Sequence, residues 1–295
     1  MLNGKIATFV PEFAETTMKR HISHYINLFL GALFSLFAAG CNSSQKWNDV
    51  EFYNVEKMEQ LTESPTVGEE EEDDTWAPLH GKENREMDVK VDMQFMKSSN
   101  DLNEKVCQLM NSHLIEILLK QSSELTVDEA VAQYIEDVKS EFHSDEVANI
   151  YHEYLKGRAE YGKENVINYR LEEDSFRGGA HPCTITTILR FNTITGDFIS
   201  LEQVFPTINQ PQLQEILLAK LMKDNGVQSV EGLHEKGILE MTDMFVSTNF
   251  ALREDSIEFH YNEYDIAPYA YGAFTICLSY EEVKDLLGVT WEKNP

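Results

Sequence analysis

The sequence predicts an α+β fold in which helices pack on a largely antiparallel sheet. Apolar and polar side chains alternate over 87–96 and 184–191 with the period of strands, whereas 101–119 carries an apolar stripe with the period of a helix. The expected strands and helices do not follow the regular βαβ order that a parallel sheet requires. With 295 residues, of which 42% are hydrophobic, the chain is long enough to bury a substantial core.

Residues 87–164 are expected to form an N-terminal α+β subdomain. Thr126 and Glu129 have the spacing of a capping box, which places the start of a helix there. The apolar residues of 145–155 predict a further helix that ends near Gly157. The expected order is a strand over 87–96, followed by helices over 101–119, from 126 onward, and over 145–155.

Residues 165–295 are expected to form a C-terminal α+β subdomain built around the glycine corner, Gly178-Gly179-Ala180-His181. In the strand that follows the corner, the larger apolar side chains share one parity and Arg190 lies on the other, as in a strand with one buried face. Gly196 suits a hairpin turn into a strand over 194–201. The later expected elements are a short helix over 201–205, a helix from 209 to 225, strands over 246–252, 257–261 and 273–278, and a helix over 280–287.

A lipoprotein signal peptide is predicted over 18–41. A basic start at Met18 precedes an apolar run over 25–37, and small residues lead to Cys41, as at the bacterial lipoprotein processing site. Cys41 is therefore the expected lipidated residue and membrane anchor, although a plain signal anchor remains an alternative. Residues 1–17 contain Pro11 and glutamates that do not suit a signal peptide, so Met18 is the expected start.

Residues 42–86 are predicted to be an acidic, flexible tether that separates the folded body from the membrane. The run of Asp and Glu over 69–74 would extend such a segment by charge repulsion. This run lacks the alternating ligands and central Gly of a calcium loop, so no metal is predicted.

The net charge of −27 argues against a nucleic-acid partner, because it repels phosphates, and it favours a cationic partner. The cysteines after Cys41 match no zinc or redox motif, and no cofactor motif is present. These cysteines are expected to be small buried residues, and a Cys183–Cys277 disulfide in an oxidising envelope remains open. The third of these cysteines is Cys107.

Ligand-binding candidates are the small residues and the imidazole of the glycine corner, together with a tyrosine-rich loop. A tyrosine buries its ring while its hydroxyl seeks a partner, so the loop fits either a core or an exposed ligand platform. His181 either caps the corner or acts as a base oriented by Glu172, Glu173 or Asp174. The candidate ligand residues are Gly178, Gly179, His181, Tyr264, Tyr269 and Tyr271.

The order of these motifs resembles the extracytoplasmic domain of RsiV-type anti-sigma factors, which also occurs beside peptidoglycan deacetylase domains and in stand-alone lipoproteins. The resemblance covers 165–287, and Pro182 follows His181 where the family usually has Gly. It implies an α+β sensory or binding domain at the cell envelope that binds lysozyme in the RsiV branch. The residues that carry the resemblance are Gly178–His181, Phe191, Thr195-Gly196, Ile199–Leu201, Phe205, Phe250, Phe259, Tyr261, Tyr264–Tyr269, Gly272 and Ile276.

Two hypotheses of function follow from the sequence. The first is a non-enzymatic lipoprotein of the bacterial envelope, facing the periplasm or the exterior, which binds a cationic protein such as a lysozyme or a cell-wall glycan. The second is a hydrolase that acts on cell-wall glycan with His181 and a nearby carboxylate. The first is favoured, because a single titratable ring without a nucleophile or metal motif is not a mechanism.

Overall fold

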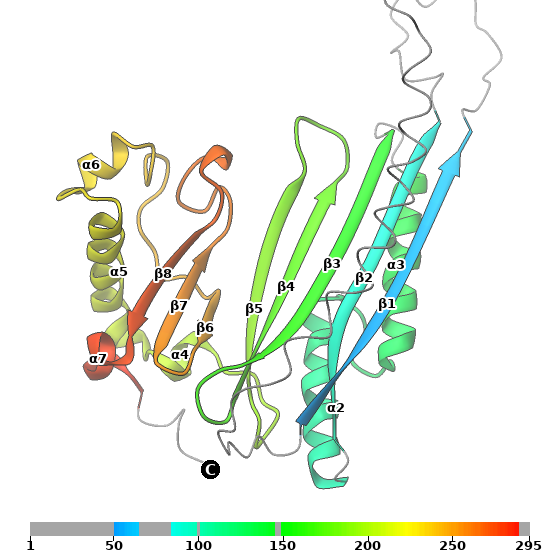
Figure 1. Cartoon of the computed structure of the whole chain (residues 1–295), viewed down its shortest axis with the longest axis horizontal. Helices are drawn as coiled ribbons and strands as arrows, with labels where there is room; N and C mark the ends of the chain where they lie inside the picture. The colour runs from blue at the N-terminus through cyan, green and yellow to red at the C-terminus, as the bar shows by residue number, and fades with distance from the viewer. Residues whose placement is uncertain (1–49, 65–83, 99–100, 145–148, 289–295) are drawn as a thin grey trace, which may run out of the picture. The chain divides into compact units, whose positions relative to one another are not determined.

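The computed structural model describes residues 50–64, 84–98, 101–144 and 149–288 (Figure 1), all of which belong to one compact unit, 46–295. The predicted signal peptide, Cys41 and residues 1–17 lie outside the described residues. In chain order the elements are β1 Val50–Glu63, β2 Arg85–Ser98, α2 Asp101–Ile117, α3 Val127–Ser144, β3 Ile150–Tyr161, β4 Val166–Phe176, β5 Cys183–Asn192, α4 Leu201–Val204, η2 Thr207–Asn209, α5 Gln210–Asp224, α6 Val230–His234, β6 Phe250–Leu252, β7 Ser256–Tyr261, η3 Tyr269–Tyr271, β8 Phe274–Ser279, α7 Tyr280–Val283 and η4 Lys284–Leu286.

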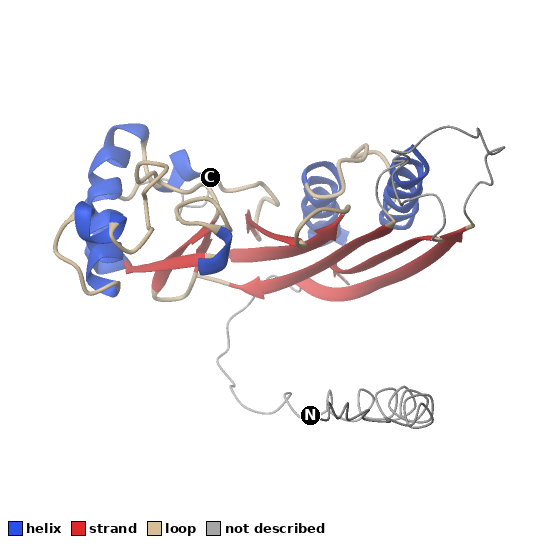
Figure 2. Cartoon of the chain, turned by 90° about the horizontal axis from the view of Figure 1, so that it is seen from above, coloured by secondary structure: helices blue, strands red, loops and turns tan. Residues whose placement is uncertain are grey.

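The first five strands form one sheet in the order β1-β2-β3-β4-β5. Neighbouring strands are antiparallel except β2 and β3, which are parallel because α2 and α3 connect them as a crossover. The two helices cover one face of the sheet (Figure 2), and the alternate residues of β2 that face them are completely buried. These residues are Val89, Val91, Met93 and Phe95. The predicted α+β class with a largely antiparallel sheet is confirmed.

The interpretation of 42–86 as a flexible tether is wrong for residues 50–63. These residues form β1, which pairs with β2 along its whole length. The face of β1 that points toward the helices includes charged side chains, and Glu59 there pairs with Lys139 of α3 at 3.1 Å. These inward charges interrupt the apolar alternation that would have predicted a strand. The acidic run over 69–74 lies outside the described residues.

The helix predicted over 145–155 is also wrong, because Ile150–Tyr161 is strand β3 and 145–148 lie outside the described residues. Gly157 is not a helix stop. It lies inside β3, where an added Cβ would stand 2.1 Å from the hydroxyl oxygen of Tyr169 on β4. The expected boundary between 164 and 165 therefore separates two paired strands of one sheet and does not divide two subdomains.

The last three strands form a second sheet in the order β6-β7-β8, and α5 packs on it through Leu213, Leu217 and Leu221. The short helix predicted over 201–205 corresponds to α4, which begins with a capping box of Ser200 and Gln203. The predicted strand over 194–201 is reduced to a single bridge between Phe191 and Phe198. Gly196 has the positive φ of 81° that the turn was expected to need.

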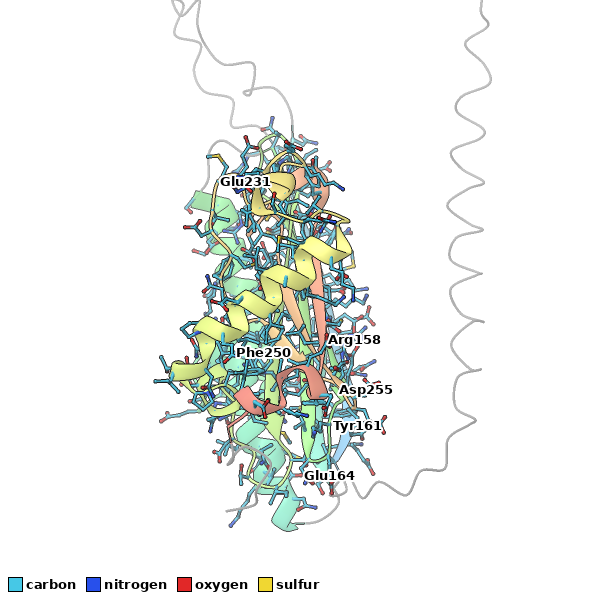
Figure 3. The ribbon with its side chains drawn as sticks, turned by 90° about the vertical axis from the view of Figure 1, so that its left-hand side faces the viewer. Arg158, Tyr161, Glu164, Glu231, Phe250 and Asp255 are labelled. Carbon is cyan, nitrogen blue, oxygen red and sulfur yellow. The ribbon has the colours of Figure 1, made fainter. Side chains whose placement is uncertain are left out.

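The prediction that β5 has one buried and one exposed face is wrong. Arg190, on the face expected to be exposed, is only 2% exposed because the second sheet packs there. Its guanidinium donates hydrogen bonds to the carbonyl oxygens of Ile188, Ile199, Thr248 and Phe250. The guanidinium also lies 3.8 Å from the ring centre of Phe250. Phe250 is buried, and its position is labelled in Figure 3. Arg190 therefore links the two sheets through hydrogen bonds.

None of the helices among the described residues is long and apolar enough to cross a membrane.

Candidate functional site

Two loops, the β4–β5 connection over 177–182 and the β7–β8 connection over 262–273, meet at His181. The imidazole of His181 stacks on the ring of Tyr269, with ring centres 3.7 Å apart and an interplanar angle of 17°. One imidazole nitrogen, Nε2, lies 3.1 Å from the hydroxyl oxygen of Tyr264. The other, Nδ1, lies 2.8 Å from the carbonyl oxygen of Pro182. We call His181, Tyr264 and Tyr269 the histidine–tyrosine cluster.

Two asparagine side chains hold the second sheet against the edge of β5 and so bring these loops together. Asn262, at the start of the β7–β8 connection, accepts a hydrogen bond from the backbone N–H of Thr186 at 2.8 Å and donates to its carbonyl oxygen at 3.1 Å. Asn249 accepts from the N–H of Ile188 at 2.7 Å and donates to the same carbonyl of Thr186 at 2.7 Å. Each amide takes the place of a strand residue at this part of the β5 edge.

The backbone around the cluster adopts conformations that few residue types tolerate. Gly178 and Gly179 have φ angles of 81° and 110°, which glycine reaches without the steric strain of a side chain. Tyr264 has a φ of 69°, an unfavourable value for an aromatic residue, and its side chain is 59% exposed. Residues held in such conformations are concentrated at functional sites. The loop therefore places a large aromatic ring in solvent at the expense of local backbone energy.

Of the predicted tyrosines, Tyr271 lies apart from the cluster. Its hydroxyl stands over Gly237, where an added Cβ would lie 3.2 Å away, and the residue is 50% exposed. Between Tyr264 and this glycine is an apolar pocket of about 320 Å³. Met241, which is 92% exposed, lines its rim. The cluster and the pocket thus form a continuous aromatic and apolar surface.

Carboxylates flank this surface. Glu240 lines the pocket, and Glu263 directly precedes Tyr264. At the start of β5, burial raises the pKa of the Cys183 thiol, and the negative charges of Glu263, Glu173 and Asp174 raise it further. The Oε2 atom of Glu263 is shielded from solvent and has no hydrogen-bond partner among the described residues. A positively charged group would find this surface electrostatically favourable.

The geometry around His181 bears on whether it acts as a base. Its two nitrogens contact a backbone carbonyl and a tyrosine hydroxyl, and neither contact is with a carboxylate. Asp174, one of the carboxylates considered from the sequence, instead accepts hydrogen bonds from Thr184 at 2.9 Å and lies 2.9 Å from His152. Among the described residues, the hydrogen bonds of His181 therefore include no carboxylate that could orient it as a base.

The cysteines differ from one another. Cys107 is buried as expected, Cys183 is half-buried, and Cys277 is exposed, contrary to the expectation of a buried residue. All three are free thiols, so the structure contains no Cys183–Cys277 disulfide. Among the described residues, no group of three or more His, Cys, Asp or Glu side chains is placed to hold a metal ion.

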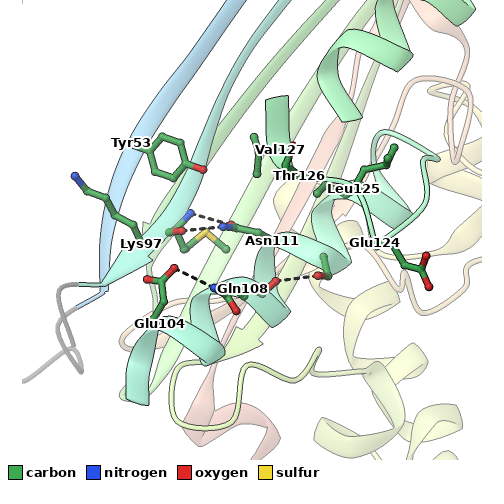
Figure 4. A pocket seen from close by; sticks show the side chains of 12 residues that line it. Tyr53, Lys97, Glu104, Gln108, Asn111, Glu124, Leu125, Thr126 and Val127 are labelled. Carbon is green, nitrogen blue, oxygen red and sulfur yellow. Dashed lines mark hydrogen bonds between the residues drawn. The ribbon is translucent and has the colours of Figure 1, made fainter. Parts of the chain in front are cut away.

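A larger pocket of about 620 Å³ lies between α2, the start of α3 and the ends of β1 and β2 (Figure 4). Most of its polar side chains are already engaged within the protein. Asn111 pairs with both the N–H and the carbonyl of Met96, at 2.9 and 2.8 Å, and Gln108 donates to Glu104 at 3.3 Å. The pocket therefore offers few free polar groups to a ligand.

Comparison with known proteins finds a family match in the C-terminal part of this chain. Residues 203–281 match the family model DUF3298, described as a protein of unknown function, so the chain contains a DUF3298 domain. The matched segment includes Tyr264 and Tyr269. It begins at residue 203 and therefore does not include His181. No protein with a curated description matches the sequence.

Solved structures of DUF3298 family proteins resemble this fold. The crystal structure of a DUF3298 family member from Bacteroides fragilis has a TM-score of 0.65 at 25% sequence identity, and the match covers 81% of this chain and 94% of that one. A DUF3298 family protein from Pseudomonas aeruginosa has a TM-score of 0.55 at 14% identity, covering 82% of this chain and 96% of that one. The coverage shows that the likeness extends beyond 203–281 to the five-stranded sheet.

Proposed function

We propose that this chain is a non-enzymatic, lipid-anchored protein of the bacterial cell envelope whose α+β body binds a cationic protein through the histidine–tyrosine cluster. The observation that carries the proposal is an exposed aromatic surface, presented by a strained Tyr264 and flanked by carboxylates. Exposed aromatic residues are frequent binding hot spots, and negative charge around them favours a positively charged partner.

The net charge of −27 supports the same choice of ligand, since it accelerates the approach of a cationic partner. The DUF3298 match is compatible with a relationship to the RsiV-type domains, in which one branch binds lysozyme. The envelope location and the anchor at Cys41 rest on the sequence of 18–41. The hydrolase hypothesis has weaker support, because the contacts of His181 include no carboxylate.

Binding of lysozyme, as the cationic probe, to the compact unit 46–295 tests the ligand proposal in a calorimeter. We expect saturable binding that weakens with added salt and that Tyr264→Ala reduces at least about tenfold, the effect of losing a hot-spot side chain. Ile208→Ala, which removes a side chain that is 88% exposed away from the cluster, serves as the control and should bind normally. Equal loss in both variants, or binding only to cell-wall glycan fragments, would contradict a cationic-protein site at the cluster.

The anchor is tested separately by mass spectrometry of the mature protein from the membrane fraction. We expect its first residue to be Cys41 carrying a lipid. An unmodified Cys41 within a longer peptide would rule out this processing.

A further inference from the structure

A buried carboxylate on β3 lies at the base of the β4–β5 loop. The side chain of this residue, Glu153, is only 1% exposed. Its Oε2 atom accepts a hydrogen bond from Nη2 of Arg177 at 3.1 Å, and its Oε1 atom accepts one from the Tyr134 hydroxyl at 3.3 Å. Arg177 directly precedes Gly178, so this ion pair holds the root of the loop that carries His181.

Charged groups from each neighbouring element surround this pair. From α3, Glu141 pairs with Nη1 of Arg177 at 2.8 Å and accepts a hydrogen bond from the Tyr151 hydroxyl of β3 at 3.2 Å. From β4, Glu173 lies on the same sheet face as Glu153, because its register partner, Leu155, is two residues along β3. Two carboxyl groups, Glu141 and Glu153, thus pair with a single guanidinium, while Glu173 lies on the same sheet face as Glu153. In such an arrangement a buried carboxyl retains a proton more easily than usual.

The electrostatics of Glu153 agree with this geometry. Burial raises the pKa of its carboxyl to about 7, and the nearby Glu173 contributes to the rise, while Arg177 opposes it. The charge beneath the loop therefore changes near neutral pH.

We propose that Glu153, Glu173 and Arg177 form a protonation-controlled anchor for the 177–182 loop. While Glu153 is protonated, Arg177 pairs with a neutral acid and holds the loop weakly. When the proton is released to solvent, Arg177 pairs with an ionised Glu153 in a buried setting and fixes the start of the loop. Ligand capture at His181 would then strengthen as the pH rises, a consequence that rests on the proposed function, whereas the anchor itself does not.

Hydrogen exchange of the full chain without ligand tests the anchor. The exchange rates of the amides at 178–181, corrected for the intrinsic effect of pH, are measured on both sides of pH 7. We expect protection to increase several-fold as the pH rises, and to become independent of pH in Glu153→Gln, which cannot ionise. A transition that persists unchanged in Glu153→Gln would overturn the proposal.

Two further variants distinguish the anchor from a titration elsewhere in the loop. Glu173→Gln removes the like charge and should move the transition to lower pH by roughly one unit, which also tests the anchor if Glu153→Gln folds poorly. His181→Ala removes the imidazole of the loop and should leave the transition in place. Loss of the transition in His181→Ala, or an unshifted transition in Glu173→Gln, would overturn the proposal. Because no ligand is used, failure of the proposed binding function would not affect these outcomes.

Discussion

The junction between the two sheets and the histidine–tyrosine cluster are both built from polar side chains distant in sequence, yet they differ in how completely those side chains are bonded. At the junction, Asn168 is 1% exposed and both accepts from and donates to the backbone of Leu252, at 2.9 and 3.0 Å. Arg190 is similarly buried among carbonyl oxygens. In the cluster, by contrast, Tyr264 is largely exposed and its backbone is strained.

This difference distinguishes structural from available polar groups. A buried side chain whose donors all meet backbone acceptors stabilises one arrangement of the chain and has nothing left to offer a ligand. An exposed aromatic side chain with a single hydrogen bond can exchange solvent for a partner at little cost. The comparison predicts that changes at the junction affect folding, whereas changes in the cluster affect binding.

The largest effect is expected from Arg190→Met. The variant keeps much of the side-chain volume but leaves four carbonyl oxygens without their donor and removes the cation from above Phe250. We expect the free energy of unfolding to fall by about 3–5 kcal/mol, the range for breaking a buried charged network. Urea denaturation of the unit 46–295 measures it.

Arg158→Met is the matched control, since Arg158 is 33% exposed and pairs with Asp92 at 2.5 Å near the surface. Exposed pairs contribute about 0–1 kcal/mol, and this pair is only partly buried, so the variant should lose clearly less stability than Arg190→Met. Equal losses in the two variants would show that Arg190 has no special role in joining the sheets.

The junction also shows where sequence reasoning failed. Arg190 falls on the strand parity that an isolated β5 would expose, and only a second sheet, assembled from residues after 249, covers it. The same limit applies to β3. The spacing of Tyr151, Tyr154 and Leu155 fits a helical stripe as well as a strand, and pairing with β2 and β4 decides the outcome.

The site was partly predictable. The sequence identified His181, Tyr264 and Tyr269 as candidates, and the structure brings these three together while leaving Tyr271 aside. The contacts that make this possible come from Asn249 and Asn262, whose amides bind the edge of β5. An asparagine near a turn is ordinarily explained by local turn geometry, so nothing in its sequence context indicates a partner more than 60 residues away.

Two glycines extend the comparison, because alanine would be unfavourable at each of them for a different reason. An added Cβ at Gly162 would stand 2.1 Å from the carbonyl oxygen of Leu252 at the junction, whereas one at Gly179 would meet nothing within 4 Å. Gly162→Ala must therefore displace backbone, and we expect a loss of about 2–3 kcal/mol. Gly179→Ala suffers only from its φ of 110° and should lose about 1 kcal/mol.

Thermal unfolding of both variants measures the difference. Gly179→Ala should retain lysozyme binding if the loop keeps its path, while Gly162→Ala should lose stability without a specific change in affinity of the folded fraction. A Gly162→Ala variant as stable as the wild type would show that the two sheets are free to shift at this point.

The smallest expected effect is a loss of stability at acidic pH. His260 of β7 is 6% exposed, its Nε2 atom lies 3.2 Å from the Asn262 amide oxygen, and its Nδ1 atom is buried without a partner among the described residues. Burial lowers the pKa of the imidazole below 6.5, and the nearby Arg170 lowers it further, against smaller opposing contributions from Asn262, Glu258 and Asp265. The folded protein thus keeps His260 neutral at a pH where the unfolded chain has already taken up a proton.

The direction of the pH effect follows from this difference. Above pH 6.5 the ring is neutral in both states and contributes no pH dependence, whereas below it the unfolded chain binds more protons and the free energy of unfolding decreases. Urea midpoints should therefore decrease as the pH falls below 6.5, and less steeply in His260→Gln, whose amide cannot be protonated in this range. Parallel slopes for the two proteins would show that the junction tolerates a charged His260 and that acid acts elsewhere in the molecule.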